Sequence, residues 1–477
     1  MIFPVCPAAV ASGLIMVKVR LVAMLLVKIG RKITASHVKL HARRIFEDSA
    51  AEPMSHFPTS AEQAMAWEAQ HGAHNYHPLP VVLDRGEGPF VWDLEGKRYF
   101  DFLSAYSAVN QGHVHPKITA ALVEQAGRLA LTSRAFYNSQ LGAYERFVTS
   151  YFGYDKVLPM NSGAEAVETA LKIARKWGYE VKGIPDGEAR IVVCDENFHG
   201  RTTAIVGFST DPGSSRHFGP FAPGFVRVPY NDLGALEEAL ADPRVAGFLV
   251  EPIQGEAGVN TPDADYIARA HALCQAARVL FMADEIQTGI GRTGSLLGTC
   301  GACTCAGACE RQPTYVKADL LILGKALSGG VYPVSAVLAD DPVMHVITPG
   351  THGSTFGGNP IAARVAVAAL EVIRDEHLAQ RARVLGERFR TAMQALVDTT
   401  DLLVLVRGRG LLNAVVVNDT PDSQTAWDLC MALASNGLLA KPTHGNIIRF
   451  APPLVLTDDQ MDEAIALIRR TVMAFAR

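Results

Sequence analysis

A series of apolar, β-branched runs recurs through residues 155–340 and predicts buried strands. The runs are KVLPM (156–160), ARIVVCD (189–195), GFLVEPI (247–253), VLFMAD (279–284), DLLILG (319–324) and PVSAVLA (333–339). Segments with helical periodicity lie between them, and in residues 164–180 the apolar positions fall on one helix face. This alternation predicts an α/β fold whose large sheet is doubly wound and mostly parallel.

The pattern changes on both sides of this region. Residues 61–71 read as a helix, and FVWDLEGKRYFDF (90–102) alternates around a Glu-Gly turn, which predicts a hairpin. From about residue 380 a helix, two short strands (LLVLVRG, LLNAVVV) and a final amphipathic helix (458–475) predict a smaller α+β domain. We therefore expect a large domain at 109–379 and a small domain formed by 53–108 and 380–477.

Charge is unevenly distributed along the chain. The 477 residues carry 44 Lys and Arg against 48 Asp and Glu, but residues 1–46 contain eight basic residues and no acidic one. The remaining body is therefore acidic, which argues against nucleic acid as a partner. Residues 1–52 resemble a mitochondrial presequence, although Met54 also suits the start of a cytoplasmic protein. Lys18 and Arg20 interrupt the apolar stretch, so we expect no membrane span.

Two of the apolar runs end in a charged residue, Asp284 and Lys325. Both residues are expected at the C-terminal tips of buried strands, where open α/β sheets bind ligands. A carboxylate and an amine at that edge suit pyridoxal phosphate, since lysine forms an imine with the aldehyde and aspartate faces the protonated ring nitrogen. Taken singly, a surface lysine and a helix-capping aspartate are the ordinary explanations.

Further motifs each have a functional and an ordinary explanation. MNSGAEAVETALK (160–172) suits a phosphate site at a helix start, or an ordinary cap made by Ser162 and Glu165. In ENFHGRTT (196–203), Phe198 suits stacking on a flat ring and Arg201 suits a carboxylate clamp. HGSTFGGNP (352–360) suits either phosphate binding or a tight turn.

Two more motifs carry charge in apolar surroundings. VEPIQGEAGV (250–259) places Glu251 and Glu256 after a predicted strand, where two acids also suit a solvated loop. NIIRFAPPL (446–454) places Arg449 in an otherwise apolar strand, where an arginine needs a partner, most simply an acid.

Together these motifs resemble those of the class III aminotransferases, which are fold-type I pyridoxal-phosphate enzymes. The resemblance covers about residues 55–475 and includes GAHNYHPLPVVLDRG (72–86), SAVNQGHVHPKI (107–118), LTSRAFYNS (131–139), NSGAEAVETALKIARKWGY (161–179), VEPIQGEAGV (250–259), ADEIQTG (283–289), LGKALSGGVYPVSAVL (323–338), HGSTFGGNP (352–360), GLLAKPTHG (437–445) and IIRFAPPL (447–454). It implies a large cofactor-binding domain, a smaller α+β domain and pyridoxal 5′-phosphate as cofactor.

The resemblance also implies roles for individual residues around the cofactor. Lys325 would form the imine and move the proton, and Asp284 would pair with the ring nitrogen. Phosphate, ring hydroxyl and ring face would be held by Ser162, Gly163, Ala164, Gln287 and Phe198. Thr355 would complete the phosphate site of a neighbouring subunit, so a homodimer or a higher oligomer of dimers is implied.

Within the family the chain is most similar to the members that act on ornithine. The implied reaction moves the δ-amine of L-ornithine to 2-oxoglutarate in two half-reactions, with acetylornithine or 4-aminobutyrate as alternative donors. Tyr76, Tyr106 and Arg201 would hold the α-amino and α-carboxylate end. Arg449 would take the 2-oxoglutarate carboxylate, and Glu256 would mask Arg449 while ornithine is bound. No metal is implied.

One stretch departs from the family pattern, GTCGACTCAGAC (298–309), which contains Cys300, Cys303, Cys305 and Cys309. Three explanations remain open: a disordered surface insertion without a hydrophobic anchor, an artefact (all twelve letters are nucleotide symbols), and a metal or redox site. The cysteine spacing matches no common zinc pattern.

Overall fold

The structure is a computed structural model that describes residues 57–301 and 316–476. The chain divides into two compact units, Met1–Gly72 and Ala73–Arg477, each described by itself. In the first unit, helix α3 (Ala61–His71) begins after Ser60 because the Ser60 side chain accepts from the backbone N–H of Gln63. The predicted targeting-like segment 1–52 lies outside the described residues. No helix of the described part has the length and apolarity needed to span a bilayer.

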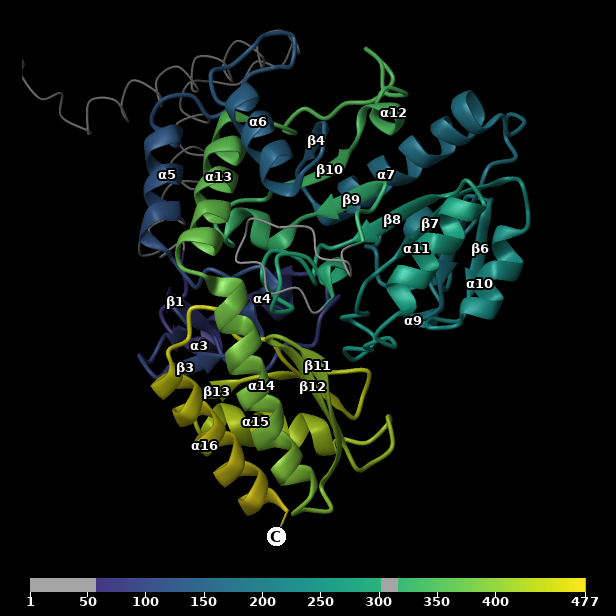
Figure 1. The fold of residues 1–477 in the computed structure, drawn as a ribbon. Coiled ribbons are helices and arrows are strands. Elements are labelled where there is room, and N and C mark those ends of the chain that lie inside the picture. Colours follow the sequence, from purple (N-terminus) through teal and green to yellow (C-terminus); the bar gives the residue numbers. More distant parts are fainter. Residues whose placement is uncertain (1–56, 302–315, 477) are drawn as a thin grey trace, which may run out of the picture. The chain divides into compact units, whose positions relative to one another are not determined.

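A seven-stranded sheet forms the centre of the second unit (Figure 1). Its spatial order is β4 (Lys156–Met160), β10 (Ser335–Ala339), β9 (Leu320–Leu323), β8 (Leu280–Asp284), β7 (Val245–Val250), β5 (Arg190–Cys194) and β6 (Phe225–Val228). The apolar runs correctly predicted every strand except β6. Parallel pairing joins β9, β8, β7, β5 and β6, which confirms the mostly parallel sheet.

Strand β10 runs antiparallel to both of its neighbours, β9 and β4. Its connection from β9 holds only the short 3-10 helix η3 (Lys325–Ser328). A parallel crossover needs a dozen or more residues and usually a helix, so this short connection turns the chain back.

Helices cover both faces of the large sheet, and the central strands β7, β8, β9 and β10 are buried along their whole length. On one face Leu320 and Ile322 pack in the same cluster as Val167 and Leu171 of α7 (Gly163–Trp177). On the other face, Leu321 and Leu323 pack with α6 (Leu141–Phe152) and α13 (Pro360–Asp375), and β5, β7 and β8 pack with α10 (Leu233–Leu240) and α11 (Tyr266–Ala276). In strands that are buried on both faces, charged residues are accommodated at the strand ends.

Two four-stranded sheets complete this unit. One contains β1 (Leu83–Glu87), β2 (Phe90–Asp93), β3 (Arg98–Asp101) and β13 (Leu438–Leu439), and the other β11 (Leu403–Arg409), β12 (Leu412–Val417), β15 (Ile447–Phe450) and β14 (Lys441–Thr443). The predicted hairpin is β2–β3, and β3 pairs in parallel with the distant β13. The predicted domain limits at 108/109 and 379/380 stay predictions.

The remaining helices flank these sheets and connect the strands. Longer ones are α5 (Pro116–Ala126), α14 (Leu378–Val397), α15 (Thr425–Ser435) and α16 (Asp458–Phe475). Short turns are α4 (Ser104–Ser107), η1 (Gly178–Lys182), α8 (Thr203–Val206), α9 (Pro212–Ser215), η2 (Gly298–Cys300) and α12 (Asp341–Met344).

The first residues of the cysteine-rich stretch lie in the core, which provides a hydrophobic anchor that the sequence does not indicate. Residues 298–300 form η2, and Cys300 is buried in a hydrophobic cluster with Leu296 and Leu297. The carboxylate of Glu285 accepts from the backbone N–H groups of Gly298 (2.8 Å) and Thr299 (2.7 Å). Val316 N donates to Thr299 O at 3.4 Å, so described residues on the two sides of 302–315 are hydrogen-bonded to each other. Strands β8 and β9 pair in parallel. Cys303, Cys305 and Cys309 lie outside the described residues.

Arg292 is fully buried and joins three separate chain segments. Its Nε and NH2 donate to Asn110 Oδ1 (3.1 and 2.6 Å), and NH1 donates to the carbonyl oxygens of Leu411 (2.9 Å) and Pro452 (2.6 Å). Planar guanidinium geometry meets all these acceptors at once, which a lysine amine does not match.

We predict that Arg292→Lys lowers the free energy of unfolding by about 3 kcal/mol, because buried acceptors lose their donors. Chemical denaturation of the full chain measures this loss. The matched control is Arg388→Lys on α14, an exposed arginine paired with Asp458 and Asp462, which should change stability by less than about 1 kcal/mol. Equal losses of stability in the two variants would contradict the proposed role of Arg292 in joining these segments.

Candidate active site

Asp284 and Lys325 lie at the C-terminal edge of the large sheet. Asp284 is the last residue of β8, and Lys325 follows the end of the neighbouring parallel strand β9 by two residues. Lys325 has a φ of 45°, a left-handed conformation that non-glycine residues seldom adopt. Such backbone strain clusters at functional sites, so this edge is the first place to look for chemistry.

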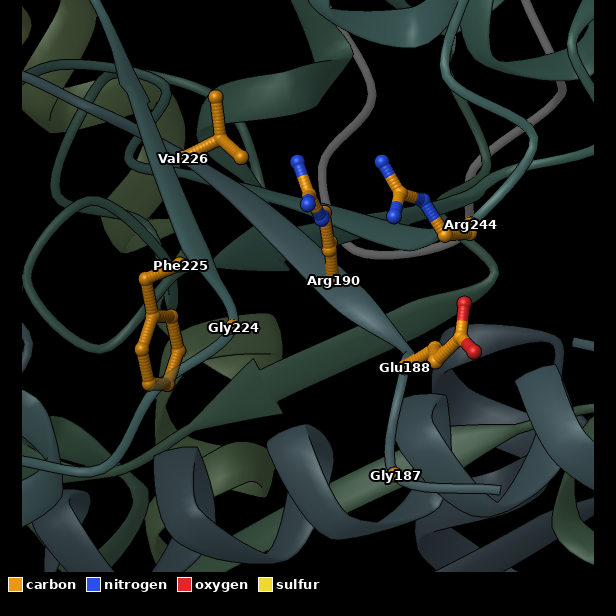
Figure 2. Close-up of a pocket in the computed structure, with 7 residues that line it drawn as sticks. All are labelled: Gly187, Glu188, Arg190, Gly224, Phe225, Val226 and Arg244. Carbon is orange, nitrogen blue, oxygen red and sulfur yellow. The ribbon is translucent and has the colours of Figure 1, made fainter. Parts of the chain in front are cut away.

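A different pocket, of about 440 Å³, lies at the opposite edge of the sheet (Figure 2). It is lined by Arg190 and Phe225, the first residues of β5 and β6, and by Arg244 just before β7. Both arginines bind Asp242, with closest distances of 3.1 and 2.9 Å, so their charge is shared with an acid of their own. This pocket lies away from Asp284 and Lys325 and is not the candidate site.

The carboxylate of Asp284 is buried, with an exposed fraction of 4%. Its Oδ2 lies 2.6 Å from Nδ1 of buried His199, and its Oδ1 accepts from the backbone N–H of Ile286 (3.1 Å). Burial works against a charged imidazole, but Asp284 raises the pKa of His199 above its ordinary value. His199 stands in the ENFHGRTT motif, but no role was predicted for it, because its partner Asp284 is 85 residues away in the sequence.

Glu251 is the second buried acid behind Asp284. Its exposed fraction is 5%, so the solvated-loop explanation is wrong for this residue. Its carboxylate accepts from the backbone N–H groups of Phe198 (2.9 Å) and Gly255 (3.4 Å). Burial raises the pKa of Glu251 to about 7, against the opposing effect of nearby His199. Glu251 thus ties the loop that carries Phe198 to the loop that carries Glu256.

The ε-amine of Lys325 has no hydrogen bond or ion pair with the described residues. Burial lowers the pKa of Lys325, and the nearby carboxylates of Glu256 and Asp284 oppose that shift. A larger share of the amine is therefore neutral near pH 7 than for an ordinary lysine. The neutral amine is the form that attacks an aldehyde.

Helix α7 starts beside this edge with a capping box. Ser162 Oγ accepts from the backbone N–H of Glu165 (3.2 Å), and the Glu165 carboxylate accepts from the Ser162 N–H (2.8 Å). The ordinary-cap explanation therefore holds for the Ser162 side chain. The N–H groups of Gly163 and Ala164, the first residues of the helix, donate to no acceptor in the described part of the chain, as a phosphate site requires.

Arg449, Glu256 and Gln287 form a compact cluster in the same cleft. Arg449 NH1 donates to Glu256 Oε1 (3.0 Å), to Gln287 Oε1 (3.2 Å) and to the Gly255 carbonyl oxygen (3.3 Å). Burial opposes ionisation of Glu256, but the charge of Arg449 outweighs it and lowers the pKa of Glu256. An acid partner for the buried arginine, as its sequence context required, is thus present.

Tyr106 lies against the other face of this cluster. The Arg449 Cζ is 4.7 Å from the centroid of the Tyr106 ring, a cation–π distance. Tyr106 is part of a left-handed turn in which Ser104, Ala105, Tyr106 and Ser107 all have positive φ. Asp101 holds the start of the turn, because its Oδ1 accepts from the N–H groups of Leu103 (2.9 Å) and Ser104 (2.8 Å).

The remaining site residues lie further out. Phe198, Arg201 and Glu256 line a cleft of about 640 Å³ together with Arg407 and His444 from the C-terminal part of the chain. The Arg201 Cζ is 5.6 Å from the centroid of the half-buried Phe198 ring. Tyr76 is 69% exposed, next to His77, whose ring stacks on Trp427 at 4.4 Å. Thr355 is exposed on a loop whose Ser354 Oγ accepts from Asn161 Nδ2 (2.9 Å), and it does not join the Asp284–Lys325 cluster of its own chain.

These groups fit pyridoxal phosphate. A free amine with a lowered pKa lies near a buried carboxylate, and unpaired amides at a helix start provide for an anion.

The raised pKa of Glu251 has a consequence for stability. The folded protein holds a proton on Glu251 that the unfolded chain loses above its ordinary pKa of 4.5, so the stability from this proton is full below that pH and is lost as the pH rises to about 7. We predict that Glu251→Gln, which has no such proton, loses less stability than the wild type between about pH 5 and about pH 8. Urea denaturation at both pH values measures the difference, with exposed Glu188→Gln as control. Parallel pH curves for Glu251→Gln and wild type would contradict it.

Comparison with known proteins places the chain in a family. Residues 71–472 match the family model described as Aminotransferase class-III. The mitochondrial ornithine aminotransferase of Drosophila ananassae is 53% identical over 447 residues, covering 94% of this chain and 99% of that protein. The solved ornithine aminotransferase of Toxoplasma gondii is 48% identical with a TM-score of 0.83, covering 91% of this chain and 98% of that chain.

A solved protein named acetylornithine aminotransferase, from Elizabethkingia anophelis, is also similar. It is 58% identical with a TM-score of 0.78, covering 87% of this chain and 100% of that chain. The chain therefore belongs to the class III aminotransferases, which are pyridoxal-phosphate-dependent enzymes of fold type I.

Proposed function

We propose that this protein transfers the δ-amino group of L-ornithine to 2-oxoglutarate, giving glutamate 5-semialdehyde and glutamate. The observation that carries the proposal is the ion pair between buried Arg449 and half-buried Glu256, close to Lys325. An enzyme that uses a terminal amine in one half-reaction and an α-keto acid in the other needs a cation that is masked in the first and available in the second. Similarity to ornithine aminotransferases over most of the chain supports the choice of donor.

The residues around the strand tips would hold the cofactor and move protons. Bound pyridoxal phosphate supplies an electron sink that weakens the bond from the amine-bearing carbon to its hydrogen. Lys325 would hold the cofactor aldehyde and carry that proton, for which its lowered pKa suits it. Asp284, oriented by its hydrogen bond with His199, would face the ring nitrogen. The other proposed contacts come from Phe198, Gln287, Ser162, Gly163 and Ala164.

Substrate orientation follows from charge. Tyr76, Tyr106 and Arg201 would hold the α-amino and α-carboxylate groups of ornithine at the outer end of the cleft, so that the δ-amine reaches Lys325. Glu256 neutralises Arg449 and so removes the cation that would draw the α-carboxylate inward. In the second half-reaction the α-carboxylate of 2-oxoglutarate would replace Glu256 on Arg449.

A second candidate donor is acetylornithine, which the similarity to the Elizabethkingia protein favours. Acetylation removes the positive charge of the α-amine and adds bulk at the outer end of the cleft. Tyr76 and Tyr106 would occupy the space that the acyl group needs, and this favours free ornithine.

We predict that ornithine alone converts the cofactor absorbance of the holoenzyme with a kcat/KM at least about tenfold above those of acetylornithine and 4-aminobutyrate. Stopped-flow absorbance measures each half-reaction without an acceptor. Lys325→Ala should abolish the conversion. Lys317→Ala, which changes a half-buried lysine paired with Asp340, should retain it. Faster conversion by acetylornithine than by ornithine would show that acetylornithine is the preferred donor.

We also propose that the protein works as a homodimer in which Thr355 of the partner subunit completes each phosphate site. Exposed aromatic side chains near Thr355 support this dimer. Phe136 and Tyr137 lie on one loop, Phe356 lies beside Thr355, and all three are exposed. A Cβ added at Gly358 would lie 3.3 Å from NH1 of Arg134, so these two loops are neighbours. Clusters of exposed large apolar side chains mark interaction surfaces.

A mixing experiment tests the shared site. Lys325→Ala and Thr355→Val each damage a different half of it, so co-expression should give mixed dimers with one complete site. We predict that the mixture regains cofactor binding and ornithine conversion that neither variant shows alone. No recovery, although mixed dimers are present by mass spectrometry, would place Thr355 in its own subunit's site or outside both.

We propose a mitochondrial location, supported by the acid-free, basic residues 1–46 and by relatives named mitochondrial. Import of the full chain into isolated mitochondria tests it, and a protein that stays outside would favour the cytoplasm.

A further inference from the structure

Gln287 occupies a position between the two ions of the Glu256–Arg449 pair. Its Nε2 donates to Glu256 Oε1 at 3.1 Å, and its Oε1 accepts from Arg449 NH1 at 3.2 Å. With the 3.0 Å contact between Arg449 NH1 and Glu256 Oε1, these bonds close a triangle. A carboxamide has one donor end and one acceptor end, so it satisfies the anion and the cation at the same time.

Gly255 lies beside this triangle, and a larger residue at this position would contact the Gln287 side chain too closely. A Cβ built on Gly255 would lie 2.5 Å from Gln287 Oε1 and 3.0 Å from its Cδ. Glycine at 255 therefore allows the carboxamide to reach both ions. Gln287 is itself buried, with an exposed fraction of 5%, so its amide has little water to exchange these bonds with.

The guanidinium of Arg449 is held from one corner only. All three of its hydrogen bonds leave from NH1, and Nε is buried without an acceptor in the described part of the chain. A carboxylate arriving on the Nε side would meet a donor that is already desolvated and unpaired, which favours binding. Full displacement of Glu256, however, requires Glu256 to lose Gln287 as well as Arg449.

We infer that Gln287 is a specificity-determining residue that locks Glu256 onto Arg449, so that dicarboxylates bind less tightly and α-amino donors are disfavoured. This role rests on the proposed function and adds to the ring-hydroxyl contact proposed for Gln287. The lock has a mechanical consequence. The Glu256–Arg449 pair acts as a gate for carboxylates, and this gate does not open while the carboxamide of Gln287 stays in place. Opening the gate therefore also moves a residue proposed to contact the cofactor.

Binding of glutarate, a dicarboxylate without the reactive carbonyl, tests the lock by calorimetry on the holoenzyme. We predict that Gln287→Met, which keeps the length but removes both hydrogen bonds, binds glutarate about tenfold more tightly than the wild type, the equivalent of about 1.4 kcal/mol. Glu256→Ala serves as the fully opened reference. Gly255→Ala should shift in the same direction by a smaller factor, because it displaces the carboxamide without deleting it.

Single-turnover kinetics adds a second readout that a general loss of structure would not produce. In Gln287→Met, conversion by glutamate through its α-amine should rise relative to conversion by ornithine. The matched control is Gln254→Met. Gln254 is a buried glutamine on the loop that carries Glu256, and its amide donates to the Asp195 carbonyl oxygen (2.6 Å) and not to Glu256. The glutarate affinity and donor ratio of this variant should stay at wild-type values.

The outcomes separate the two proposals. Unchanged or weaker glutarate binding in both Gln287→Met and Gly255→Ala overturns the lock, even if the wild type uses ornithine. A wild-type holoenzyme that ignores ornithine but whose glutarate affinity rises in both variants overturns the proposed donor and leaves the lock standing.

Discussion

The burial of Asp284 constrains the whole C-terminal edge of the large sheet. Strands β8 and β9 are covered on both faces, so a charge within them would lack partners, and an isolated buried charge is costly. At the strand end, Asp284 meets His199 from the loop after β5, at 2.6 Å. Glu251, from the end of β7, holds the backbone of that same loop at Phe198. The loop after β5 is thus held at the tips of β7 and β8 by the carboxylates of Glu251 and Asp284.

Sequence patterns predicted the strands whose side chains are buried on both faces, because such strands are continuous apolar runs. They missed β6 (Phe225–Val228), because this strand is short and includes the exposed Arg227. They also gave no sign that β10 runs backwards. That reversal follows from the connection, since the residues between β9 and β10 form only one short 3-10 helix and hold no crossover. Local composition identifies a strand, whereas direction depends on how the chain travels between strands.

Local signals indicated three residues of the candidate site, but not their partners. Lys325, Asp284 and Arg449 stand out because charge is unusual in apolar surroundings. Gln287 carries no such signal for the gate, as its contacts with Glu256 and Arg449 join segments far apart in the chain. The left-handed turn at Tyr106 is likewise hidden, because Ser104–Ser107 contains no glycine and is held by Asp101 through tertiary structure.

The proposed exchange of carboxylates on Arg449 would explain why the protein keeps an ion pair between buried Arg449 and half-buried Glu256. Replacing such a pair by packed hydrophobic residues is often neutral or stabilising. An apolar pair, however, has nothing to offer a substrate carboxylate, whereas Arg449 has a desolvated Nε without an acceptor in the described part of the chain. The Tyr106 ring also contacts this guanidinium, and that contact does not depend on Glu256. Under the proposed function the pair would serve exchange between carboxylate partners. Its geometry suits that exchange, because the hydrogen bonds of Arg449 to the described residues all leave from one nitrogen.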